Sequence, residues 1–317
     1  DIFFVISGYL ITKNIQQEMQ QNSFSLLEFY QKRVIRLAPA FITVLICCTL
    51  AYWQFSTPTE LHEYFKSLIG ATTLSINFYF FHSLSDYFSI DAQSTPLLHI
   101  WSLSLEEQFY LLWPALLLFT SKLKLRIKII LFSFIFFSSS LYSYYSAIHQ
   151  PIFAYYLLPT RLFEFMLGAF LVALPHKSTT LTTKLFFTIF SLVVIFIFGV
   201  MLNKESIFPS YNAFFVCFSG AIYIYFARVD EQKIIWQPFL YLGKISYPMY
   251  LWHWPIIVGL HANSIILDWK IKFVVIISTI LLVAYTYTCI ERLARKLKTH
   301  PHIIQWLFIL PSLIITF

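Results

Sequence analysis

Apolar blocks recur along the whole chain, and each is roughly 16–22 residues long, the length at which a helix crosses the hydrocarbon core of a bilayer. The blocks are continuous, whereas the strands of a membrane barrel alternate apolar and polar residues. Charged residues make up only 12% of the 317 residues, against about 25% in a soluble domain. We therefore predict an all-α integral membrane protein, folded as a polytopic helical bundle.

About ten blocks are long enough to be membrane spans. We expect them at residues 1–12, 37–53, 100–120, 129–146, 160–174, 184–202, 211–227, 243–261, 271–290 and 303–317. The first residues, DIFFVISGYLIT, and the last, IIQWLFILPSLIITF, are already apolar. We expect both ends to be cuts through a longer protein.

Most of the 22 Lys and Arg residues fall in five short loops, which the positive-inside rule assigns to the cytoplasm. These loops are 13–36, 122–128, 177–184, 228–244 and 292–298. An even number of crossings must then separate span 37–53 from span 100–120. We therefore predict that the apolar segment 64–82 does not cross, but is a re-entrant or interfacial segment on the outer side. The basic excess follows the topology, so we expect no nucleic-acid partner.

Two adjacent glutamates, Glu106 and Glu107, interrupt span 100–120. They lie about 10 Å from its outer end, at a rise of 1.5 Å per residue. An ionisable side chain within a span indicates a functional site, because carboxylates are unfavourable in lipid. Adjacent helical residues point about 100° apart. We expect one glutamate to serve chemistry or ligand binding and the other to have a structural partner.

One side of this span carries a polar and aromatic stripe at helical spacing. The stripe consists of His99, Ser102, Glu106, Tyr110 and Trp113. A purely structural reading stays open, in which a membrane glutamate is neutral or pairs with Arg161.

Arg161 and Glu164 lie three residues apart near the outer end of span 160–174. They share a helical face at this spacing, so they are expected to be able to pair. Both are ionisable residues inside a span, which makes them candidate site residues.

His253 lies near the middle of span 243–261, within the sequence YPMYLWHWP. The neighbouring tryptophans would suit an interfacial belt, but their depth argues against it. Two prolines, Pro248 and Pro255, should loosen the helix, and freed backbone is tolerated where it lines a cavity. We therefore predict that His253 lines a cavity.

Arg33 and Arg36 share a helical face just before span 37–53. One interpretation is that they anchor the topology by the positive-inside rule. The other is that they form a phosphate site, because guanidinium groups bind phosphate through paired hydrogen bonds. The four cysteines show no metal or disulfide spacing, so we predict no metal site and four buried, inert thiols. These cysteines are Cys47, Cys48, Cys217 and Cys289.

Six stretches together resemble the acyltransferase-3 family, the integral-membrane O-acyltransferases of the O-antigen acetylase type. They are DIFFVISGYLI, FYQKRVIRLAP, SINFYF, PLLHIWSLSLEEQFYLLWP, RLFEFMLGAFL and LGKISYPMYLWHWPI, in the family's order along the chain. The resemblance implies a multi-pass enzyme of the bacterial cytoplasmic (inner) membrane. It would move an acyl group, typically acetyl, from cytoplasmic acyl-CoA to a hydroxyl of a cell-surface glycan or its lipid-linked precursor.

The resemblance also assigns roles to residues. Arg33 and Arg36 match the family's RxxR motif and would hold acyl-CoA, the donor substrate, with no bound cofactor. Glu106, Glu107 and His253 are the catalytic candidates, because a carboxylate near a sugar hydroxyl can orient it or accept its proton. The acceptor-side candidates are Arg161, Glu164, Trp101, Tyr110 and Asn77.

The family's first helix carries a basic residue and a histidine implied in acyl transfer, and this chain starts after it. We therefore expect residues 1–298 to be the transmembrane acyltransferase domain without that helix, and residues 1–317 to be inactive alone. His253 is not the family's histidine. Residues 299–317 resemble an extra span found in members with an external SGNH-hydrolase-like domain.

The main rival function is a transporter or flippase for a lipid-linked saccharide. Inverted repeats would favour it, and none is evident. A non-catalytic scaffold would not need charged residues on several spans. Lipopolysaccharide, peptidoglycan, capsule and small glycosides all stay open as acceptors.

Overall fold

The computed structural model describes residues 1–84, 94–175, 179–203, 206–227, 236–262 and 268–293. Every element within these ranges is a helix. The chain divides into two compact units. Unit 1 comprises Asp1–Phe24 and Leu105–Val229, and unit 2 comprises Ser25–Ser104 and Asp230–Phe317. Each is described by itself below.

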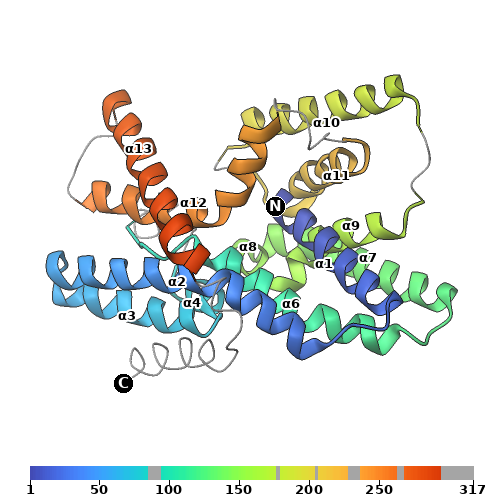
Figure 1. Cartoon of the computed structure of the whole chain (residues 1–317), viewed down its shortest axis with the longest axis horizontal. Coiled ribbons are helices and arrows are strands. Elements are labelled where there is room, and N and C mark those ends of the chain that lie inside the picture. The colour runs from blue at the N-terminus through green and yellow to red at the C-terminus, as the bar shows by residue number, and fades with distance from the viewer. Residues whose placement is uncertain (85–93, 176–178, 204–205, 228–235, 263–267, 294–317) are drawn as a thin grey trace. The chain divides into compact units, whose positions relative to one another are not determined.

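Unit 1 is a packed set of helices in which α1 lies against α9, and α11 contacts both (Figure 1). Its helices are α1 (Ile2–Gln20), α6 (Ile100–Thr120, from Leu105 onward), α7 (Leu125–His149), α8 (Pro151–Tyr156), α9 (Leu158–Ala173), α10 (Leu181–Met201) and α11 (Ser210–Phe226). Four aromatic rings stack in its centre. The ring centroids of Phe4 and Phe165 lie 4.6 Å apart, those of Phe165 and Phe109 4.4 Å apart, and those of Phe109 and Trp113 5.1 Å apart. This aromatic column joins α1, α9 and α6.

Two glycines allow α1 and α9 to approach at backbone distance. A Cβ at Gly8 would lie 1.9 Å from the Phe165 carbonyl oxygen, and one at Gly168 would lie 1.9 Å from the Val5 carbonyl oxygen. Small residues play this role in membrane helix pairs because lipid provides no hydrophobic force to bring helices together. The SGYL and LGAF sequences therefore encode a helix crossing.

Replacing Gly168 by alanine should destabilise unit 1 by about 3 kcal/mol, the upper end of overpacking effects. The new methyl group would meet main-chain atoms, which no side-chain rotation can move. The control is Gly199→Ala on α10, where a Cβ would meet nothing within 4 Å. Thermal unfolding in detergent should show a large loss for Gly168→Ala and none for the control. Equal unfolding temperatures in both would contradict the described crossing.

Unit 2 contains α2 (Leu26–Phe55), α3 (Pro58–Thr72), α4 (Ile76–Ser83), the beginning of α6, α12 (Gln237–Ala262), α13 (Trp269–Tyr285) and a π-helical turn, Thr286–Glu291. In this unit α12 contacts both α2 and α13. The Tyr247 hydroxyl donates to the Leu37 carbonyl at 3.1 Å, and the Trp252 indole donates to Thr286 Oγ1 at 2.9 Å. Hydrogen bonds thus link α12 to α2 and to the π-helical turn.

Five described segments are long and apolar enough to cross a membrane. They are Leu26–Phe55, Leu125–His149, Pro151–Ala173, Leu181–Met201 and Trp269–Glu291. The predicted helical, multi-pass membrane architecture is therefore confirmed, whereas the prediction of about ten spans is not. The predicted final span, 303–317, and the region 299–317 lie outside the described residues.

Helices α1 and α2 extend beyond the apolar blocks 1–12 and 37–53 that were predicted as spans, at the end of α1 and at the start of α2. The apolar block 1–12 is only the first half of α1, which continues through polar residues to Gln20. Helix α2 begins at Leu26, not near residue 37, because the Ser25 hydroxyl accepts a hydrogen bond from the Glu28 amide and caps the helix. Hydropathy marks only the apolar stretch of a helix, so it misses such polar extensions.

Segment 64–82 is not one continuous helix, because α3 ends at Thr72 and α4 begins at Ile76. A capping box begins α3, in which the Thr57 amide and hydroxyl both donate to Glu60 at 2.8 Å. These hydrogen bonds lower the pKa of Glu60, the backbone one most strongly. Neither short helix is among the five apolar segments, and the re-entrant or interfacial position stays a prediction.

The prediction that all four cysteines are buried was half right. Cys48 and Cys217 are buried, whereas Cys47 and Cys289 are exposed. All four thiols are free. Helix α2 is apolar on several faces, so hydropathy alone could not tell its inner face from its outer one.

Candidate functional site

Glu106 accepts hydrogen bonds from two hydroxyl groups in unit 1. Ser7 Oγ on α1 lies 3.3 Å from Oε1, and Tyr110 Oη, one turn along α6, lies 3.3 Å from Oε2. The two carboxylate oxygens therefore have different donors, which fixes the plane of the carboxylate. The Glu106 side chain is half-buried, so it is held in place yet not sealed off.

Three residues of the predicted stripe, Glu106, Tyr110 and Trp113, make polar contacts in unit 1. Beyond Glu106 and Tyr110, the Trp113 indole donates to Thr12 Oγ1 at 2.8 Å. Two polar contacts thus join α6 to α1 within unit 1. Glu107, about 100° around the helix, is also half-buried. The placement of Ser7 beside Glu106 favours Glu106 as the carboxylate of the candidate site.

Arg161 and Glu164 form the ion pair that their spacing predicted. Arg161 Nη1 lies 2.8 Å from Glu164 Oε1 and 3.0 Å from Asp1 Oδ1. Arg161 Nε donates to the Tyr155 carbonyl at 3.2 Å. The guanidinium also lies 5.0 Å from the ring centroids of Tyr155 and Phe208, within the range of cation–π attraction.

This charge cluster is enclosed, because the side chains of Arg161 and Glu164 are 0% exposed and that of Asp1 is 16% exposed. It joins the beginning of α1 to the beginning of α9. A sugar hydroxyl could not contact Arg161 or Glu164 in this conformation. Their acceptor-side role stays a prediction, and their contacts show a structural one.

His99 and Tyr250 meet in unit 2, where the Tyr250 hydroxyl donates to the His99 carbonyl oxygen. The same hydroxyl lies 3.0 Å from Ser102 Oγ. A phenol has one proton, so Ser102 is the donor in that second bond. Tyr250 on α12 therefore holds the first turn of α6.

The ring of His99 is buried beside two other rings. The Tyr250 centroid lies 5.1 Å away and the His253 centroid 5.6 Å away. His253 is half-buried, and its Nδ1 lies 2.6 Å from the Tyr250 carbonyl oxygen. Unit 2 therefore contains two neighbouring imidazoles. The sequence placed His99 in the stripe and His253 among the catalytic candidates, but did not predict that the two rings meet. The cavity predicted beside His253 stays a prediction.

The two tryptophans that flank His253 bind protein groups. The Trp252 indole donates to Thr286, and the Trp254 indole donates to the Thr95 carbonyl at 2.9 Å. Both therefore serve packing within unit 2, which supports the argument against an interfacial belt. Pro248 and Pro255 lie within the continuous helix α12.

The remaining site candidates are on separate elements of unit 2. Arg33 and Arg36 lie on successive turns of the first part of α2, with Arg33 half-buried and Arg36 exposed. Asn77 on α4 is fully buried, and Trp101 on α6 is 7% exposed. The structure thus brings Glu106 together with Tyr110, and Arg161 with Glu164. The predicted roles of the candidates in catalysis and binding stay predictions.

Asp1 and Ser7, which contact the candidate charges, were not singled out from the sequence. Ser7 directly precedes Gly8, and small residues at a helix crossing are the one signal that could have marked it. Asp1 is an acidic residue directly before an apolar block. At that position its carboxylate contacts Arg161.

Comparison with known proteins decides the family. The model of an acyltransferase domain family, Acyl_transf_3, matches residues 1–289. The chain belongs to this acyltransferase family. No solved structure matches the chain significantly.

Curated relatives include the O-acetyltransferase OatA of Staphylococcus aureus, 33% identical over 93% of this chain and 52% of that protein. The peptidoglycan O-acetyltransferase OatA of Listeria monocytogenes is 32% identical over 81% of this chain and 44% of its own length. An uncharacterised Haemophilus influenzae protein is 38% identical over 56% of this chain and 74% of its own length. The chain thus spans about half the length of the OatA proteins that it matches.

Proposed function

We propose that this protein is a membrane O-acyltransferase that moves an acetyl group from acyl-CoA to a hydroxyl of a cell-envelope glycan. The proposal is supported by the family and by the OatA relatives, whose names describe O-acetyl transfer. The single structural observation that carries it is the Glu106 carboxylate, held within a helical membrane protein by Ser7 and Tyr110.

Glu106 has the chemistry that transfer to a hydroxyl needs. The reaction forms a C–O bond between the acyl carbon and the acceptor oxygen, and it breaks the C–S bond of the thioester. The acceptor hydroxyl loses a proton, which ends on the sulfur of free CoA. A positioned carboxylate can accept that proton or orient the hydroxyl. Ser7 and Tyr110 would hold the carboxylate in the required orientation.

The donor is proposed to bind near Arg33 and Arg36 on the cytoplasmic side. They lie on the first part of α2, within the basic stretch 13–36 of the sequence, which the positive-inside rule assigns to the cytoplasm. Guanidinium groups bind the phosphates of CoA well, because their planar forks match phosphate oxygens. The exposed side chain of Arg36 is open to such a ligand.

The acceptor class is a glycan of the envelope, on the outer side of the cytoplasmic membrane. The printed name of the Listeria relative specifies peptidoglycan, so peptidoglycan is the first acceptor to test. Lipopolysaccharide is the second acceptor to test.

The experiment is to express the full-length protein in a bacterium that lacks envelope O-acetylation and to measure ester-linked acetate in purified glycan. Mild alkali should release acetate only from cells that express it. Peptidoglycan and lipopolysaccharide are analysed separately to identify the acceptor. Unchanged ester content in every glycan, with the protein present in the membrane, would contradict the proposal.

A further inference from the structure

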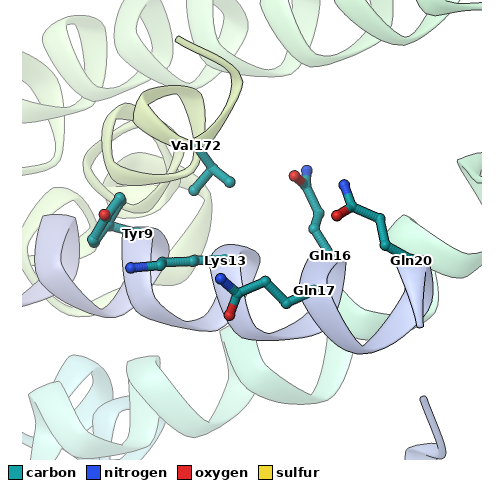
Figure 2. Close-up of a pocket in the computed structure, with 6 residues that line it drawn as sticks. All are labelled: Tyr9, Lys13, Gln16, Gln17, Gln20 and Val172. Atoms are coloured by element: carbon teal, nitrogen blue, oxygen red, sulfur yellow. The ribbon is translucent and has the colours of Figure 1, made fainter. Parts of the chain in front are cut away.

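A pocket of about 180 Å³ lies over the polar half of α1, within unit 1 (Figure 2). It is lined by Tyr9, Lys13, Gln16, Gln17 and Gln20 of α1 and Val172 of α9. None of these residues belongs to the Glu106 site or to the Arg161 cluster. We call this feature the Lys13 pocket.

The lining residues of α1 recur every three or four positions, so they share one helical face. The helix packs through another face, where Ile11 and Ile15 are buried. At one end of the polar face, Tyr9 packs against the buried cluster of Val5, Leu171, Cys217 and Ala221, whereas Lys13 and the three glutamines are not members of that cluster. Figure 2 shows Lys13 extending along α1 toward Tyr9, and its ammonium lies 5.6 Å from the Tyr9 ring centroid.

The chemistry of the pocket favours an anion. No carboxylate lines it. Within the described part of the chain, Lys13 forms no ion pair. A lysine ammonium binds phosphate as a point charge. The three glutamine amides offer both donors and acceptors, which suits a ligand with amide or hydroxyl groups beside its phosphate.

The size of the pocket limits what enters it. Sites that bury a whole drug-sized ligand have volumes of about 300–1,000 Å³. A pocket of about 180 Å³ is too small for an entire CoA molecule or lipid. It fits one phosphate and the polar groups next to it.

We propose that the Lys13 pocket binds a phosphate group together with the amide or hydroxyl groups adjoining it. Acyl-CoA carries this chemistry in its phosphopantetheine arm, and an anionic lipid carries it in its headgroup. Assignment to acyl-CoA rests on the proposed function.

The test measures binding of coenzyme A to the purified full chain in phosphatidylcholine nanodiscs, with and without added phosphatidylglycerol. Lys13→Gln should weaken coenzyme A binding about tenfold, because a charge-assisted hydrogen bond is lost. Lys13→Arg should restore it. Gln16→Glu, which places a carboxylate in the pocket, should weaken it as well. Pantetheine, which lacks phosphate, should bind equally weakly to the wild type and to Lys13→Gln.

The matched control is Lys122→Gln, an exposed lysine in another basic loop, which should bind coenzyme A normally. Native mass spectrometry of the same samples would count retained phosphatidylglycerol. Loss of lipid retention in Lys13→Gln, with coenzyme A binding unchanged, would support the proposal with a headgroup as occupant. Unchanged binding of both ligands in Lys13→Gln and Gln16→Glu would overturn it.

An assay of acetyl transfer by the wild type distinguishes a failure of the pocket proposal from a failure of the proposed function. Transfer by the wild type with normal phosphate-ligand binding in Lys13→Gln would overturn only the pocket. Lys13-dependent binding of coenzyme A in a protein that never transfers acetyl would overturn only the proposed function.

Discussion

Arg161→Leu should destabilise the protein by about 3–5 kcal/mol, because it leaves two carboxylates without their buried partner. Arg161 bridges Asp1 and Glu164 at 3.0 and 2.8 Å, and its side chain is fully buried. The measurement is thermal unfolding and the yield of monodisperse protein in detergent. Folded protein should be nearly absent.

The charge explanation is tested by a second substitution. Glu164→Gln, combined with Arg161→Leu, should recover part of the lost stability, since one uncompensated carboxylate is removed. Arg126→Gln is the control, because Arg126 is an exposed residue on α7 and its loss should have no effect. If Arg161→Leu unfolded at the wild-type temperature, the cluster would not be the structural element described here.

Glu106→Gln should lower the turnover number for acetyl transfer by about 10²–10⁴-fold, the usual contribution of a general acid or base. The amide keeps the shape of the carboxylate, and its oxygen can still accept a hydrogen bond from Ser7 or Tyr110. Folding should therefore be preserved. The measurement is the steady-state rate with labelled acetyl-CoA, beside an unfolding curve for the same preparation.

Three further variants test whether the loss of rate is specific to the Glu106 carboxylate. Glu107→Gln should reduce the rate less, because Glu106 is the carboxylate that Ser7 on α1 contacts. Ser7→Ala should reduce it about tenfold, since one of the hydrogen bonds that orient the carboxylate is lost. Glu63→Gln, at an exposed position on α3, should leave the rate unchanged. A wild-type rate in Glu106→Gln would remove this residue from the catalytic machinery.

The helical membrane class could be predicted from the sequence because lipid permits few backbone solutions. Long apolar blocks such as 184–202 correspond to described helices within a few residues, here Leu181–Met201. The extensions of α1 to Gln20 and of α2 back to Leu26 could not be predicted from hydropathy. Polar residues continue a helix outside the apolar stretch, and only caps such as Ser25 mark its true start.

The candidate site was predictable where its contacts are local in sequence. Arg161 and Glu164 pair across one turn, and Tyr110 lies one turn from Glu106, so helical spacing was enough. Ser7 contacts Glu106 across 99 positions and Asp1 contacts Arg161 across 160. Such contacts depend on how α1 packs on α6 and α9, which no local pattern contains.

We propose a transfer of acetyl from CoA to an envelope hydroxyl at a site containing Glu106. Its most direct test is to reconstitute the full-length protein in vesicles with acetyl-CoA and a peptidoglycan acceptor, and to measure free CoA thiol and acetyl ester together. The proposal predicts that both products form in equal amounts with the wild type and that neither forms at an appreciable rate with Glu106→Gln. Movement of the glycan across the vesicle membrane without thiol release or ester formation would contradict it.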